Sequence, residues 1–198
     1  MIIGNREFDL VNHFYMMGIL NVTPASFSDG GKFNSLDSAL YQAEKLINDG
    51  ADILDVGGES TRPGHEKVSE EEEIERICQV IDRLKMQFDI PISLDTYKPG
   101  VAKVGIQVGA DMINDIWGLK WDASMAEVIA GSGVVCCLMH NRKDSNYCDL
   151  LKDVKQDLQD SIGIARAAGI EADKIIIDPG IGFAKDLEQN LLVMKNLK

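Results

Sequence analysis

Positive charge is scarce in this chain of 198 residues, in which 20 Lys and Arg stand against 32 Asp and Glu, a formal net charge of −12. An acidic surface repels phosphate backbones and anionic lipid headgroups, so this balance disfavours non-specific binding of nucleic acids or membranes unless a local basic patch exists. The sequence shows no such patch. We therefore expect neither a nucleic acid nor a membrane among its partners.

Long apolar runs are also missing. The longest, residues 133–139, falls far short of the roughly 18 residues that a transmembrane helix needs. The first residues lack the cationic and then apolar order of a secretion signal. These absences predict a cytoplasmic protein.

Metal-binding patterns are absent as well, because the three His residues are scattered and the four Cys residues fit no metal spacing. Cys136 and Cys137 are adjacent, so they would lie on opposite faces of a strand. We expect all four cysteines to be ordinary buried thiols.

The composition that is present, 45% hydrophobic and 26% charged, is that of a globular protein with one core, which predicts a single domain over residues 1–198. Short β-prone runs alternate with segments of helical period. Because each parallel crossover needs a helix, this alternation predicts an α/β fold with a parallel sheet. The predicted strands are residues 15–20, 52–56, 92–94, 111–113, 134–139 and 174–177.

Helix ends are marked at several positions. Ser35 and Ser69 stand where N-caps are expected, and Gly50 follows the first apolar stripe as a C-terminal glycine would. The acidic run at 70–73 is most simply a solvated first turn that complements the helix dipole. Ahead of the first strand, Gly4-Asn5 predicts a small hairpin that closes the bottom of a barrel.

Two architectures fit the alternation, an open doubly wound sheet and a (β/α)₈ TIM barrel. The predicted strands end in polar side chains, which a barrel gathers around one axis at the face where catalytic residues lie. The barrel therefore explains the pattern better. Such a barrel takes about 250 residues, so we expect about six βα units here and a chain truncated at its C-terminus. The strand-end residues are Asn21, Asp55, Asp95, Asn114, Asp115, His140 and Asp178.

Asp95, Asn114 and Asp178 would provide two carboxylates and a carboxamide in one pocket. Carboxylates only accept hydrogen bonds and a carboxamide does both, which suits a heterocycle with several N–H donors. A single strand-end Asp is often only a helix cap. Several on different strands favour a ligand site.

The loop after the second strand combines glycines with Ser60, Thr61 and Arg62. A guanidinium is a bidentate partner for phosphate oxygens, so this loop could grip a phosphate in an acidic protein. In the alternative, Arg62 pairs with Glu59 or Asp55. Gly180-x-Gly182-x-x-Lys185 matches half of a dinucleotide fingerprint but lacks its third glycine.

Over essentially the whole chain, five stretches resemble, in order, the motifs of the dihydropteroate synthases: MGILNVTPASFSDGG (17–31), DILDVGGESTRPG (52–64), ISLDT (92–96), DMIND (111–115) and DPGIGF (178–183). The resemblance implies a TIM-barrel transferase of folate biosynthesis. It would condense 6-hydroxymethyl-7,8-dihydropterin diphosphate with 4-aminobenzoate, releasing 7,8-dihydropteroate and diphosphate with Mg²⁺ as cofactor. A homodimer is implied for the full-length protein.

The resemblance also implies roles for single residues. Asp95, Asn114 and Asp178 would hold the pterin ring, with Asp95 and Asp178 offsetting positive charge on it, and Arg62 would stabilise the leaving diphosphate. Asn21 would ligate Mg²⁺ or touch the diphosphate. The remaining contacts implied are Ile116, Met139 and Phe183 along the pterin slot, Thr61 at the diphosphate, and Phe27 and Pro63 at the aminobenzoate site that sulfonamides imitate.

Two departures from the family pattern stand out. Ala25 occupies a position where the family has Asp, and the chain stops at Lys198, before segments that supply a pterin-binding Lys and further diphosphate contacts. We expect these 198 residues alone to be inactive or nearly so. A non-catalytic pterin-binding module or incomplete subunit is the alternative. A third alternative is a methyltetrahydrofolate-using corrinoid methyltransferase, which would share the barrel and the pterin site. Such an enzyme should lack the loop at 60–62, so the presence of this loop argues against it.

Overall fold

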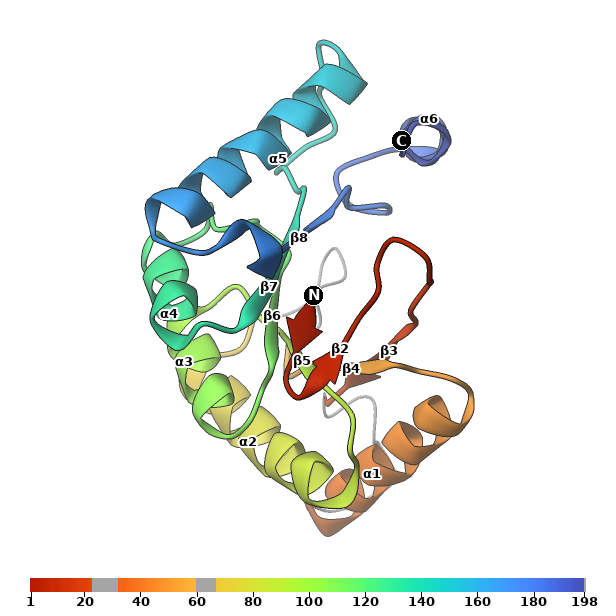
Figure 1. Ribbon diagram of the computed structural model, residues 1–198, viewed down its shortest axis with the longest axis vertical. Coiled ribbons are helices and arrows are strands. Elements are labelled where there is room, and N and C mark those ends of the chain that lie inside the picture. Colours follow the sequence, from red (N-terminus) through yellow and green to blue (C-terminus); the bar gives the residue numbers. More distant parts are fainter. Residues whose placement is uncertain (23–31, 60–66, 198) are drawn as a thin grey trace.

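The computed structural model describes residues 1–22, 32–59 and 67–197. Six parallel strands form one curved sheet in which spatial order equals chain order (Figure 1). A doubly wound sheet reverses its order at a switch point, whereas a barrel adds each strand beside the previous one. The predicted barrel architecture is confirmed. Its strands are β3 (Met17–Asn21), β4 (Ile53–Gly57), β5 (Ile92–Asp95), β6 (Met112–Asp115), β7 (Val135–Met139) and β8 (Ile175–Asp178).

A helix follows every strand of this sheet, and α1 to α5 line its convex side (Figure 1). Helix α6 packs on α5 through Val193, which lies against Val154 and Leu158. In the described ranges, none of the helices is long and apolar enough to cross a membrane. The helices are α1 (Lys32–Asn48), α2 (Glu70–Gln87), α3 (Pro99–Gln107), α4 (Ser124–Ser132), α5 (Leu150–Ala167) and α6 (Leu187–Lys195), with a short 3₁₀ helix η2 (Ala172–Lys174) before β8.

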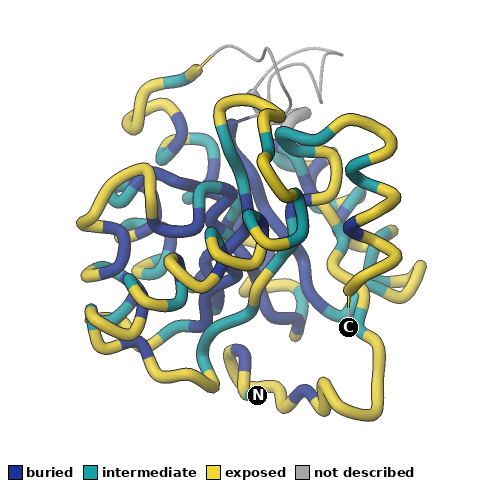
Figure 2. The backbone as a smooth tube through the Cα atoms, turned by 90° about the horizontal axis from the view of Figure 1, so that it is seen from above, coloured by how far each residue is buried: buried dark blue, intermediate teal, exposed yellow. Residues whose placement is uncertain are grey.

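The main core lies between the convex face of the sheet and the helices. Alternate strand residues point to opposite faces, and those on the convex face, such as Leu54, Leu94 and Leu138, are fully buried against helix residues such as Ile77 and Ile81. Each such side chain contributes about 1.5–3 kcal/mol by leaving water. Figure 2 shows these buried segments gathered at the centre of the molecule.

The cysteine pair follows the same alternation. Cys136 belongs to the main core and Cys137 to a second cluster on the concave face, so the two lie on opposite faces as predicted. The prediction that all four thiols are buried holds for Cys136 and Cys137. Cys78 on α2 is only half-buried, and Cys148 is exposed just before α5, where the chain enters a helix from a surface loop.

A hairpin of β1 (Ile2–Ile3) and β2 (Arg6–Glu7) lies on the concave side of the sheet (Figure 1). Its turn is Gly4-Asn5, as predicted, and Gly4 has a φ of 61°, which glycine adopts without strain. Ile3 and Phe8 pack against residues near the N-terminal ends of strands, including Met112. The hairpin therefore closes the bottom of the barrel.

The element boundaries confirm one predicted helix cap and correct the predictions made for Ser35 and Asp55. Ser69 caps α2 as predicted, its hydroxyl accepting the Glu72 N–H at 3.2 Å. Ser35 is not a cap, because α1 begins at Lys32, ahead of the first apolar stripe. Asp55 is not a strand end either. It lies inside β4, which continues to Gly57.

Candidate functional site

One row of side chains crosses the concave face of all six strands. Partners in register on parallel strands point to the same face. Above this row, Met139 pairs with Asp178 one layer nearer the strand C-termini. Four of the polar residues that the sequence assigns to ligand binding lie on strands, and the structure brings them together. They are Asn21, Asp95, Asn114 and Asp178. The row reads Asn21, Gly57, Asp95, Asn114, Cys137 and Ile176.

Gly57 separates two of these polar groups. A Cβ atom at Gly57 would lie 3.6 Å from Asn21 Oδ1 and 3.5 Å from Asp95 Oδ2. Both oxygens therefore border the space over the glycine, which has no side chain to fill it. Asn21 and Asp95 are half-buried, as are Asn114 and Asp178. Their polar atoms are partly desolvated, which strengthens their hydrogen bonds with a ligand.

Asp55 lies one layer below the row and is almost fully buried. Its Oδ1 accepts the Ser93 hydroxyl at 2.6 Å, and its Oδ2 accepts the Asn114 amide at 3.1 Å. Burial raises the pKa of Asp55, while these two hydrogen bonds act in the opposite direction. Asp55 therefore orients Asn114 from below. Sequence reasoning missed this supporting role, although a carboxylate within an apolar run was its signal.

The apolar wall of the site is a cluster of buried side chains above β5, β6 and β7. Ile116 and Met139 are buried in it, and Phe183 from the loop after β8 packs against them. Tyr97 and Trp117 complete the cluster. The three residues assigned to the pterin slot thus belong to one apolar cluster. Beside the polar row, they form an arrangement suited to a flat ring with polar edges.

Asp115 and His140 do not face this space, contrary to the sequence prediction. Asp115 accepts the backbone N–H groups of Trp117 at 2.8 Å and Leu119 at 2.7 Å. It therefore holds the turn after β6, and burial raises its pKa to about 6. His140 is fully buried, with Nε2 3.0 Å from Asp157 Oδ2.

A buried ion cluster follows β4. Glu59 accepts hydrogen bonds from Lys98 Nζ at 2.6 Å and Tyr97 Oη at 2.8 Å. Lys98 Nζ also donates to Glu73 Oε2 at 2.7 Å and to the carbonyl of Val68 at 2.7 Å. The ammonium of Lys98 thus joins Glu59 after β4, Glu73 at the start of α2 and Val68 just before that helix.

The two alternative partners for Arg62, Glu59 and Asp55, each make the contacts described above. Arg62 itself lies outside the described residues. So do the other loop residues singled out from the sequence, which are Ala25, Phe27, Ser60, Thr61 and Pro63.

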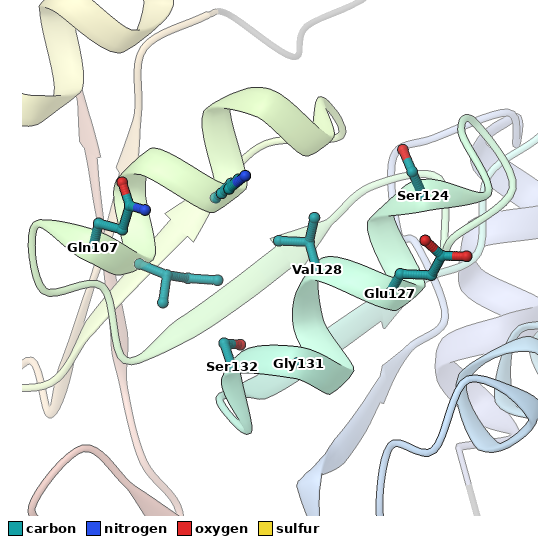
Figure 3. A pocket seen from close by; sticks show the side chains of 8 residues that line it. Gln107, Ser124, Glu127, Val128, Gly131 and Ser132 are labelled. Atoms are coloured by element: carbon teal, nitrogen blue, oxygen red, sulfur yellow. The ribbon is translucent and has the colours of Figure 1, made fainter.

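Within the described ranges, no cluster of three or more His, Cys, Asp or Glu side chains could hold a metal ion. A hollow of about 410 Å³ opens on the outer side of the molecule between α3 and α4 (Figure 3). Ile106 and Val128 line it together with Lys103 and Glu127. These residues belong to helices on the convex side, across the sheet from the polar row.

Comparison with known proteins gives consistent matches. Residues 17–198 match the family model described as "Pterin binding enzyme". The dihydropteroate synthase of Clostridium beijerinckii is 56% identical over 198 residues, which is 100% of this chain and 74% of that protein. The structure of a dihydropteroate synthase from Clostridium difficile, determined in the presence of pteroic acid, has a TM-score of 0.94 and 49% identity and covers 96% of this chain and 73% of its own. The structure of the dihydropteroate synthase of Xanthomonas albilineans with 4-aminobenzoic acid has a TM-score of 0.89 and 41% identity. The match covers 94% of this chain and 68% of that one.

Proposed function

Since the chain belongs to the pterin-binding enzymes and, among them, to the dihydropteroate synthases, we propose that it condenses 6-hydroxymethyl-7,8-dihydropterin diphosphate with 4-aminobenzoate. The products are 7,8-dihydropteroate and diphosphate. The single observation that carries the proposal is the polar row on the concave face with the apolar cluster of Ile116, Met139 and Phe183 beside it. The ligands of similar structures, pteroic acid and 4-aminobenzoic acid, agree with it.

In this proposal the pterin ring lies in the slot. Its N–H and amino groups donate to the carboxylates of Asp95 and Asp178, and Asn114, oriented by Asp55, both donates and accepts. Ile116, Met139 and Phe183 pack on its faces. The N–H and amino groups of the ring then meet carboxylate acceptors, and its apolar faces leave water.

The reaction forms a C–N bond and breaks a C–O bond. The aminobenzoate nitrogen attacks the methylene carbon and loses a proton, and the C–O electron pair leaves with diphosphate. Positive charge develops on the pterin as the C–O bond breaks, so Asp95 and Asp178 stabilise the transition state electrostatically. The amine is a neutral nucleophile, which needs positioning more than activation.

Mg²⁺ is the cofactor in this proposal, and Asn21 would hold it. Mg²⁺ prefers oxygen ligands and commonly binds through one or two protein groups plus substrate phosphates. Asn21 Oδ1 borders the same space as Asp95 Oδ2, so the oxygen donors present suit the ion. When bound, Mg²⁺ would neutralise charge on the diphosphate. We also assign Thr61 and Arg62 to the diphosphate and Phe27 and Pro63 to aminobenzoate, on the sequence motifs alone.

The proposal extends to a single domain over residues 1–198, a cytoplasmic location and a homodimeric full-length protein. The continuous six-stranded sheet supports the single domain. Light scattering on the full-length protein would test the homodimer.

A second candidate, a pterin-binding module without catalysis, is favoured by Ala25, which can neither accept a hydrogen bond nor offset cationic charge. Calorimetry with the pterin diphosphate and Mg²⁺, followed by product assay in the full-length natural protein, tests both functions. Binding with product formation supports the synthase, and binding without product favours the module. Absence of binding overturns both.

A further inference from the structure

Lys185 closes the loop that connects β8 to α6. Its ammonium nitrogen lies 2.9 Å from the carbonyl oxygen of Gly180, 3.0 Å from that of Phe183 and 2.9 Å from His140 Nδ1. An ammonium group has three hydrogens, and here each meets one acceptor. Burial lowers the pKa of Lys185 to about 8, so it is mostly charged at neutral pH.

His140, the residue after β7, is itself held in place by a hydrogen bond to α5. Because His140 Nδ1 accepts from Lys185, the ring proton is on Nε2, which donates to Asp157 on α5 at 3.0 Å. The same carboxylate oxygen accepts Arg142 Nε at 2.6 Å. Burial and the nearby charge of Lys185 lower the pKa of His140 to about 4, so the imidazole is neutral. Lys185 is thus anchored to the segment after β7 and, through His140, to α5.

Both carbonyls that Lys185 holds belong to residues coupled to the site. The N–H of Gly180 donates to Asp178 Oδ1 at 2.8 Å, while the carbonyl of Gly180 accepts from Lys185. Phe183 packs against Ile116 and Met139. One side chain outside the polar row therefore fixes a carboxylate and an aromatic ring of the slot.

We propose that Lys185 is a positioning residue for the pterin: through Gly180 it orients the carboxylate of Asp178, and through the carbonyl of Phe183 it holds the phenyl ring against the apolar cluster of the slot. The inference rests on the proposed function, because it takes the pterin to be the ligand that Asp178 and Phe183 contact. Lys185 itself does not touch the ligand. The charged groups that act on it are Asp178 on β8, Arg142 after β7 and Asp157 on α5.

The test uses the full-length natural protein as the parent and compares Lys185→Met with Lys185→Arg and with Lys195→Met, which alters an exposed lysine on α6. Nitrogen-15 NMR reports the His140 tautomer and the amide exchange of Gly180. Calorimetry with Mg²⁺ gives the affinity for the pterin diphosphate, and kinetics give KM for each substrate. For Lys185→Met we expect the His140 Nδ1 signal to shift and Gly180 to exchange at least tenfold faster. Pterin affinity should fall at least tenfold, with less than twofold change in KM for 4-aminobenzoate.

Lys185→Arg keeps the charge and should recover part of the pterin affinity, and Lys195→Met should match the parent protein. Pterin affinity of Lys185→Met within twofold of the parent overturns the proposal, as does an equal loss for both substrates. If the parent binds no pterin, the proposed function fails. The NMR signals then still decide whether Lys185 holds the loop, and unchanged His140 and Gly180 signals overturn that part too.

Discussion

Asp55 Oδ2 accepts a hydrogen bond from Asn114 Nδ2 over 3.1 Å, from one layer below the row in which Asn114 lies. Replacing Asp55 by Asn leaves an amide group facing one of its two donors, Ser93 or Asn114. An unsatisfied buried donor costs about 1–3 kcal/mol. We expect Asp55→Asn to lower the free energy of unfolding by that amount and to weaken pterin binding severalfold.

Urea denaturation and calorimetry measure the two effects of Asp55→Asn. Ser93→Ala is the matched control, since it removes one donor to Asp55 and leaves the Asn114 contact in place. Ser93→Ala should lower the free energy of unfolding and leave the affinity for pterin unchanged. Equal affinities for all three proteins would show that Asp55 does not orient Asn114.

Lys98 holds two buried carboxylates, those of Glu59 and Glu73, at 2.6 Å and 2.7 Å. Removing one partner from a buried ion cluster costs about 3–5 kcal/mol, because charge remains buried. We expect Lys98→Met to lower the free energy of unfolding by about this amount. Lys85→Met breaks the more exposed pair with Asp111 and should cost at most about 1 kcal/mol. Similar losses in the two variants would contradict the prediction.

His140 should make stability depend on pH. The unfolded chain takes up a proton on this residue near pH 6.5, and the folded chain only near pH 4. The contribution of His140 to the free energy of unfolding should therefore be fully present above pH 6.5. It should be lost as the pH falls to 4, a decrease on the order of 3 kcal/mol. His140→Gln keeps a donor toward Asp157 without titrating. Its stability should not show this decline.

Denaturation of both proteins at several pH values gives a difference curve. Asp115 titrates in the same range with the opposite effect, since its raised pKa adds stability at low pH that is lost as pH rises to about 6. Because this contribution is the same in both proteins, it cancels in the difference. A difference that stays constant between pH 4 and 6.5 would contradict the assignment to His140.

Gly57→Ala should separate binding from folding. The added methyl would meet Asp95 Oδ2 at 3.5 Å and Asn21 Oδ1 at 3.6 Å, ordinary contact distances, so stability should change by less than about 1 kcal/mol. The methyl would occupy the space that both oxygens border. Affinity for the pterin diphosphate with Mg²⁺ should fall at least tenfold. Gly131→Ala, in the open on α4, is the control and should bind normally.

The barrel, its six strands and the hairpin could be predicted from the sequence, because apolar periodicity and turn chemistry are local signals. The polar row could be predicted in part. Asn114 and Asp115 are neighbours in one strand, so only one of them can face inward, and strand alternation selects Asn114. The same rule turns His140 away, since its neighbour Met139 faces the site.

Contacts between distant segments could not be predicted. His140 and Lys185 are 45 residues apart, and nothing local to either marks their hydrogen bond. The start of α1 was misplaced for a different reason. Ser35 directly precedes Leu36 and has the side chain of an N-cap, whereas the helix begins three residues before Ser35, at Lys32.

The row across the concave face takes each of its six members from a different strand. No stretch of sequence can therefore form the binding surface by itself, and it exists only once all five strand pairings have formed. A pterin that bridges the row would bind the native state alone and stabilise it by RT ln(1 + [L]/Kd). Ligand-induced protection should accordingly spread over hydrogen exchange in every strand, which makes the small molecule a reporter of how cooperatively the sheet assembles.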